Sequence, residues 1–122
     1  MILADGFYEW MALVEAKKRY LIKRHDGQPF AFAGIQDKVL VEGEMVDPCA
    51  ILTTTPRGVM PQVHDRMPVI LPASAQAAWL DRKSRYTDLL EPDADTLELV
   101  AVSTLVNCVG NDDALLAEPL TN

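Results

Sequence analysis

The chain has 122 residues and a mass of 13.5 kDa, which is the size of one domain. Apolar residues make up 49% and charged residues 24%, which excludes disordered, collagen-like and disulfide-stapled chains. The net charge of −7 argues against sequence-independent binding to duplex DNA, which depends on many contacts between cations and phosphates. It still allows a local basic groove that binds a short single strand.

The sequence carries no sign of a membrane or secreted protein. No apolar run approaches the roughly 20 residues that span a bilayer, and the first residues lack the pattern of a secretory signal. Cys49 and Cys108 lack the spacing of metal ligands, so they predict reduced, partly buried thiols in a cytoplasmic protein. Because there is no repeat and no linker, we expect residues 1–122 to form a single domain.

The expected elements of the first third are a turn and three strands. Residues 4–6 form a turn signal, and the aromatic-rich residues 7–10 behind them favour a strand. Residues 20–25 and 30–35 flank an Asp26-Gly27 pair. An Asp-Gly pair between two such runs predicts a β-hairpin.

The middle of the chain predicts further strands and one helix. Residues 50–55 favour a strand, and the apolar triplet 69–71 between two prolines is too short for a helix. Residues 73–81 are the clearest helix, with Ser74 as the expected N-cap.

Towards the end of the chain, residues 85–90 predict a second helical turn and residues 97–103 predict a strand. Residues 111–113 predict the cap of a last short helix. Several strands with a few short helices, and no regular alternation of the two, predict an α+β fold with mostly antiparallel strands.

Glu9 is the first candidate for chemistry. In a strand it shares a face with Phe7, while Tyr8 and Trp10 share the other face. A carboxylate among aromatic side chains is poorly solvated, which suits general acid–base work. The alternative is an edge-strand glutamate whose carboxylate lies in water.

His64 is the second candidate. It lies in a polar segment between Pro61 and Pro68, two residues that stiffen the backbone. A neutral imidazole can take or give a proton near pH 7, and Asp65 could set its tautomer. The alternative is a surface pair of Asp65 and Arg66 with a bystander histidine.

Other classes of site lack their motifs. Two histidines outside any two-histidine helical motif and two distant cysteines predict no metal site. There is no nucleophile elbow for a serine hydrolase and no glycine-rich phosphate loop, so we expect no cofactor.

A few polar and aromatic residues have both a binding and a structural interpretation. Arg57 and Arg66 could contact phosphate, although solvated loop arginines are commoner. The basic run 17–19 is more often a solvated face than a binding patch, and Trp79 is expected in the core. Asn107 is most simply a turn or cap residue.

Read together, five ordered blocks resemble one known family, the SOS response-associated peptidase (SRAP) family. The block Ala4-Asp5-Gly6-Phe7-Tyr8-Glu9-Trp10 and the block His64-Asp65-Arg66-Met67-Pro68-Val69-Ile70-Leu71-Pro72 are highly specific. Residues 29–34, 51–54 and 102–112 supply the others, so that the resemblance covers nearly the whole chain.

The resemblance implies a protein that senses abasic sites in single-stranded DNA. In that family an N-terminal cysteine attacks the ring-opened aldehyde of the abasic sugar, and its thiol and amine close a thiazolidine crosslink. The same cysteine removes the family's leader residue. Glu9 and His64 match the family's active-site Glu and His, which move protons during ring opening. Arg66 matches a DNA-contacting arginine, and Trp10 lies at the same groove.

The chain departs from the family at its start, because Met1 is followed by Ile2 and not by cysteine. Cys49 and Cys108 offer no free α-amine beside the thiol, so we expect this chain alone to form no crosslink. The family's N-terminal segment is also absent from the sequence. We therefore expect an incomplete SRAP-type β-rich core whose open strand edges favour self-association.

Two alternatives stay open beside an SRAP domain. One is a non-catalytic module that binds single-stranded DNA through Arg57, Arg66 and Trp10. The other is a degenerate fragment without a DNA role, in which Glu9 and His64 are remnants.

Overall fold

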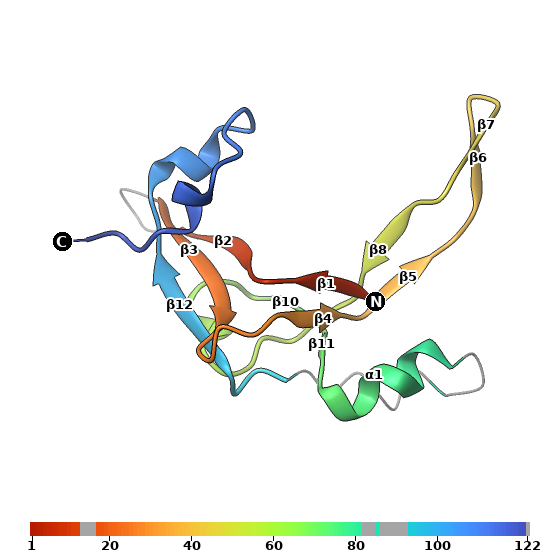
Figure 1. Cartoon of the computed structure of the whole chain (residues 1–122), viewed down its shortest axis with the longest axis horizontal. Helices are drawn as coiled ribbons and strands as arrows, with labels where there is room; N and C mark the ends of the chain where they lie inside the picture. The colour runs from red at the N-terminus through yellow and green to blue at the C-terminus, as the bar shows by residue number, and fades with distance from the viewer. Residues whose placement is uncertain (13–16, 82–84, 86–92, 122) are drawn as a thin grey trace.

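A computed structural model describes residues 1–12, 17–81, 85 and 93–121 (Figure 1). All strand pairs in this part of the chain are antiparallel, and short helical segments accompany them. The predicted α+β fold with mostly antiparallel strands is therefore confirmed.

The strands are short and fall into separate small sheets. They are β1 (Ile2–Ala4), β2 (Phe7–Ala12), β3 (Lys17–Arg24), β4 (Phe30–Phe32), β5 (Gly34–Gln36), β6 (Val39–Val41), β7 (Glu44–Val46), β8 (Cys49–Ile51), β9 (Thr53–Thr54), β10 (Met67–Pro68), β11 (Ile70–Leu71) and β12 (Leu97–Ala101). The helices are α1 (Ala73–Leu80) and the 3-10 turns η1 (Met60–Gln62), η3 (Thr104–Asn107) and η4 (Ala114–Ala117).

Two three-stranded sheets enclose the main core. One has the order β1-β4-β11 and the other the order β12-β3-β2. Side chains of these sheets and of the segments around them form one buried apolar cluster: Ile22, Phe30, Phe32, Met60, Val63, Met67, Ile70, Ala94 and Leu97. The partly buried Phe7 packs against it, and the rings of Phe7, Phe30 and Phe32 meet edge to face with centroids 5.2 to 6.2 Å apart. β4 lies in the middle of its sheet, and all three of its residues are buried.

The predicted hairpin between residues 20–25 and 30–35 is wrong. The turn forms, with Gly27 at a φ of 73°, but β3 pairs with β2 and β12 while β4 pairs with β1 and β11. The first hairpin of the chain is instead β2–β3, with Phe7 opposite Ile22. The Asp-Gly pair therefore passes the chain from one sheet to the other.

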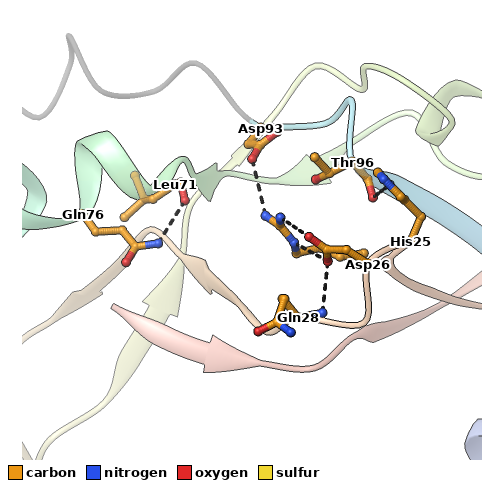
Figure 2. A network of polar contacts seen from close by, with 8 residues as sticks. His25, Asp26, Gln28, Leu71, Gln76, Asp93 and Thr96 are labelled. Carbon is orange, nitrogen blue, oxygen red and sulfur yellow. Dashed lines mark hydrogen bonds and ion pairs between the residues drawn. The ribbon is translucent and has the colours of Figure 1, made fainter.

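A polar network holds this crossing in place (Figure 2). The Arg24 guanidinium donates two hydrogen bonds to Asp26, at 2.9 and 2.6 Å, and lies 3.7 Å from Asp93. The Asp26 carboxylate also accepts the Gln28 backbone N–H at 3.0 Å. These bonds, that of Arg24 first, hold the pKa of Asp26 well below its usual range, and the bond to Asp26 raises the pKa of Arg24. The charged pair thus turns the backbone away from β3.

A ring of three backbone hydrogen bonds splits the strands predicted over 30–35 and 50–55. Ala33 N–H donates to Val69 O at 2.9 Å, Val69 N–H to Leu52 O at 2.8 Å, and Leu52 N–H to Ala33 O at 2.9 Å. Each of the three residues lies between two strands that pair with different partners. We call this ring the junction.

Beyond the junction, residues 34–51 form an arm that projects from the rest of the molecule (Figure 1). It consists of the pairs β5–β8 and β6–β7, and every residue from 35 to 51 is exposed. The tip turns through Glu42 and Gly43, whose φ values of 49° and 87° are both positive. Two such residues are typical of a type I′ hairpin turn, a signal that our sequence analysis overlooked.

The helix predicted over 73–81 is confirmed as α1, but Ser74 is not its N-cap as predicted. Pro72, in an extended conformation, precedes the first turn, and no side chain caps it. Proline at that position starts a helix without the hydrogen bond that Ser74 was expected to supply. Trp79 is partly buried against the junction, and its Nε1–H donates to Gly34 O at 3.3 Å.

The last third of the chain follows the predicted order. β12 covers most of the strand expected over 97–103, and Asp113 caps η4 by accepting the Leu115 N–H at 2.9 Å. The helical turn expected over 85–90 lies, apart from residue 85, outside the described residues. Within the described ranges, no helix has the length and apolar character needed to cross a membrane.

Candidate active site

One pocket brings together three of the residues singled out from the sequence. Glu9, His64 and Arg66 line it, from β2 and from the segment before β10. Its volume is about 280 Å³, and the remaining walls are Phe7, Phe32, Ile51, Thr53, Met67 and Pro68. Residues that are distant in sequence therefore form a small, mostly apolar site with one carboxylate, one imidazole and one guanidinium.

Glu9 reaches this pocket through the alternation of β2. Phe7 and Glu9 line it, while Tyr8 and Trp10 do not, as their positions on a strand predict. The residue is half-buried. No hydrogen bond or ion pair within the described ranges occupies its carboxylate. The carboxylate is therefore available to exchange a proton with a ligand in the pocket.

The segment that carries His64 is anchored to the core on both sides. Met60, Val63 and Met67 are buried, and the His64 N–H donates to Met60 O at 3.1 Å. Burial of these three side chains, together with Pro61 in the preceding 3-10 turn, holds an exposed histidine at a fixed place on the pocket rim.

Three groups surround Nδ1 of His64. The Arg66 backbone N–H lies 3.0 Å from this nitrogen and can donate to it, and the Arg66 backbone oxygen lies 3.1 Å from it and can accept from it. Asp65 Oδ1 also lies 3.1 Å from Nδ1. The nitrogen thus has one donor and two acceptors within reach, so either neutral tautomer finds a partner there. The expectation that Asp65 sets the tautomer stays a prediction.

Arg66 is held on the rim by one residue of β9. Its Nη2 donates to Thr53 O at 2.6 Å and to Thr53 Oγ1 at 3.0 Å, and its Nε donates to the same hydroxyl at 3.3 Å. Thr53 thereby fixes the plane of an exposed guanidinium beside the pocket. A cation in a fixed orientation is suited to a phosphate or carboxylate of a ligand.

The other two predicted residues lie elsewhere. Trp10 points to the opposite face of β2, where its Nε1–H donates to Asn107 Oδ1 at 2.8 Å. Asn107 accepts the Arg19 Nε–H as well, at 3.1 Å, so it acts as a cross-link between η3 and the sheet. The Arg57 backbone N–H contacts Met67 Sδ at 3.3 Å, but Arg57 does not line the pocket.

Sequence reasoning missed the residues that shape the site. Thr53 orients Arg66, and Phe32 forms a wall from β4. No local pattern identifies either one, because each reaches the pocket only through strand pairing. Asn107 was taken as a turn residue, although the structure has it bonding to two side chains of β2 and β3.

The cysteines and possible metal ligands lie apart from this chemistry. Cys49 and Cys108 are both exposed, which corrects the expectation of partly buried thiols, and neither lines the pocket. Among the residues that the structure describes, no three His, Cys, Asp or Glu side chains gather as a metal site would require. What the pocket offers is a carboxylate and an imidazole that can each exchange a proton with a ligand, next to a guanidinium in a fixed orientation.

Comparison with known proteins gives one family. The model of the family described as SOS response associated peptidase (SRAP) matches residues 1–109. The chain is 42% identical to the abasic site processing protein YoqW of Bacillus subtilis (strain 168) over 125 residues, which cover 97% of this chain and 56% of that protein. It is 28% identical to the abasic site processing protein YedK of Escherichia coli (strain K12), over 96% of this chain and 55% of that one.

Solved structures share the fold. A protein from Bacteroides thetaiotaomicron superposes with a TM-score of 0.87 at 24% identity, over 98% of this chain and 56% of that one. A protein from Bordetella bronchiseptica superposes with a TM-score of 0.74 at 32% identity, over 84% of this chain and 53% of the other. The chain thus spans about half the length of the relatives that it matches.

Proposed function

The chain belongs to the SOS response-associated peptidase (SRAP) family, and we propose that it recognises abasic sites in single-stranded DNA through the pocket of Glu9, His64 and Arg66. In the cell this activity would serve the response to DNA damage. The observation that carries the proposal is the convergence of these three side chains on one small pocket. The curated relatives named as abasic site processing proteins support the choice of ligand.

The size and walls of the pocket suit a sugar without a base. Its volume of about 280 Å³ lies just below the range of roughly 300–1,000 Å³ for pockets that hold drug-sized ligands. Phe7, Phe32 and Ile51 supply apolar walls against the deoxyribose ring. The fixed guanidinium of Arg66 on the rim can pair with a flanking phosphate.

The two titratable groups suit the opening of that sugar. The closed abasic sugar is a hemiacetal. It opens when a base takes the proton of the C1 hydroxyl and an acid protonates the ring oxygen, as the bond from C1 to that oxygen breaks. Glu9 supplies a carboxylate at the pocket for the first transfer, and the imidazole of His64 at the same pocket supplies the proton for the second.

We further propose that this chain by itself recognises the lesion without forming the thiazolidine crosslink. That crosslink needs a thiol and a free α-amine on the same residue, and position 2 is Ile. Cys49 and Cys108 lie within the chain and outside the pocket lining. A band that survives denaturing electrophoresis after incubation with an abasic strand would contradict this part of the proposal.

Fluorescence anisotropy tests the recognition itself. A labelled single strand with one central abasic site should bind more tightly than the same strand with thymidine at that position. Glu9→Gln and His64→Gln should each reduce this preference by about tenfold, the equivalent of roughly 1.4 kcal/mol. Equal affinity for the two strands would contradict the proposal.

Two matched controls separate the pocket from general effects. Glu44→Gln removes a carboxylate of the exposed arm, and His25→Gln removes the other histidine, whose Nδ1 contacts Thr96 O away from the pocket. Both variants should keep the abasic preference of the unmodified chain. A loss as large as that of Glu9→Gln would show that the pocket is not the source of the preference.

We also propose that the chain self-associates through the arm. At least half of the surface of four apolar side chains in the arm is exposed: Ile35, Leu40, Val41 and Met45. The β6–β7 sheet has only two strands. Unpaired strand edges with exposed apolar side chains favour pairing with another chain. Sedimentation velocity should show a species that grows with concentration, and Leu40→Lys should shift it towards the monomer. A single monomeric species at every concentration would contradict this proposal.

A further inference from the structure

A second pocket lies at the start of β3, where the end of β12 runs beside it. Its volume is about 580 Å³, and its polar lining comes from β3 and from the start of η3: Lys17, Lys18, Arg19, Tyr20, Ser103 and Thr104. Among the described residues, the lining carries three cations and no carboxylate, although the chain as a whole has a net charge of −7. This local excess of positive charge has no role in the site described above.

The two lysines of this pocket make no ion pair with the described residues. Lys17 and Lys18 are exposed, and within the described residues neither has a carboxylate partner. The next basic residues of β3 differ, because Lys23 lies 3.5 Å from Glu98 and Arg24 is bound to Asp26. The two exposed lysines are therefore available to an external anion.

Arg19 is positioned in advance. Its Nε donates to Asn107 Oδ1 at 3.1 Å, and its Nη1 donates to the Lys17 backbone oxygen. Neither partner carries a negative charge, so the described residues orient the guanidinium without neutralising it. A cation that is held in place loses less conformational entropy when it binds an anion.

The strand register connects this pocket to the candidate active site. Glu9 pairs with Tyr20 and Met11 pairs with Lys18, so Glu9 and Lys18 lie on the same face of the β2–β3 ladder. They are diagonal neighbours, and such pairs lie about 7–8 Å apart. A DNA strand whose abasic sugar lies at Glu9 can thus place a neighbouring phosphate within reach of Lys18.

From this geometry we propose that the pocket of Lys17, Lys18 and Arg19 binds a phosphodiester of the DNA strand that flanks the abasic site. The proposal rests on the proposed function, because a nucleic acid is the polyanion that the neighbouring pocket would receive. Lysines near a backbone phosphate release counterions on binding, which makes the affinity depend on salt. The basic run therefore extends the binding surface beyond the lesion.

Salt titrations of binding test this proposal with the full chain and labelled single strands, abasic and intact. Each lost phosphate contact should lower the slope of log affinity against log salt by about 0.7. We expect this change for Lys18→Gln and about twice that change for Lys17→Gln with Lys18→Gln, on both strands. Lys18→Arg, which keeps the charge, should restore the slope. Lys38→Gln is the matched control, because it removes one exposed lysine of the arm.

The outcomes separate this proposal from the previous one. A slope that is unchanged in the lysine variants, or that falls equally in Lys38→Gln, would overturn the second pocket even if the abasic preference persists. Equal affinity for abasic and intact strands, with a slope that depends on Lys18, would contradict lesion recognition and support the phosphate site. An unmodified chain that binds neither strand would overturn both.

Discussion

Short antiparallel strands lie on both sides of the junction, but they are buried on one side and exposed on the other. On the core side, β4 has a neighbour on each edge, and all its residues are buried. On the arm side, β6 and β7 have only each other, and all their residues are exposed. Both regions form regular antiparallel ladders, β4 from Phe-Ala-Phe and β6 from Val-Leu-Val. Strand formation is therefore a local property here, whereas burial depends on what the sheet packs against.

The comparison also explains where the site lies. Its polar groups come from β2 and from a segment whose buried anchors are Met60, Val63 and Met67. The arm contributes only Ile51, its last residue, at the junction itself. A site that must hold a carboxylate and an imidazole in a fixed relative position is thus built on the packed side of the junction.

The largest expected difference between the two sides is the cost of removing an apolar side chain. Phe30 is 4% exposed in the core and Leu40 is 69% exposed in the arm. Phe30→Ala should lower the free energy of unfolding by about 3–5 kcal/mol, because it leaves a cavity among packed aromatic rings. Leu40→Ala should change it by no more than about 0.5 kcal/mol.

Urea denaturation of both variants measures these free energies. The measurement is made at a protein concentration low enough to keep the chain monomeric, so that association through the arm does not contribute to the free energy of unfolding. Similar losses for the two variants would show that the arm is part of the cooperative core, which would remove the distinction between the two sides.

A smaller effect is expected at the crossing between the two core sheets, and it depends on pH. The bond from Arg24 holds the pKa of Asp26 well below its usual range, whereas the pKa of an unfolded aspartate is about 3.9. The unfolded chain therefore takes up this proton more readily. The stabilisation is complete above the unfolded pKa and is lost as the pH falls through the folded one.

Asp26→Asn should accordingly lower the urea midpoint at pH 7 and reduce the further loss between pH 5 and pH 3. The effect is small because the pair is exposed to solvent. Asp47→Asn, in the arm, is the matched control and should leave the midpoint at pH 7 unchanged. If Asp26→Asn and the unmodified chain lose stability equally on acidification, the pair does not stabilise the crossing.

The candidate site was predictable where local pattern and family resemblance were enough. Alternation along residues 7–10 placed Glu9 and Trp10 on opposite faces of one strand, and β2 confirms this. The blocks around Glu9 and His64 indicated the family, and the family model confirms it. The roles of these residues in recognition stay predictions, which the strand-binding experiments address.

Other features needed partners that no local pattern reveals. The family resemblance placed Trp10 and Arg66 at one DNA groove. In the structure Asn107 holds Trp10 on the face of β2 away from the pocket and Thr53 holds Arg66 at the pocket, and the DNA contacts of both residues stay predictions. The Asp26-Gly27 turn was expected to close a hairpin. Instead the chain crosses to another sheet, because β1 and β11 already occupy both edges of β4.

The sequence by itself determined the class of fold, the strand alternation at Glu9, the helix α1 and the family. The first three depend on the periodicity and propensity of residues that are close in sequence. The family depends on motifs that can be recognised as contiguous blocks. Only the tertiary structure decided the split at Ala33, Leu52 and Val69, the exposed arm and the meeting of Glu9 with His64. A backbone hydrogen bond takes whichever partner the packed core brings near, so the pairing of distant segments is decided by the whole chain.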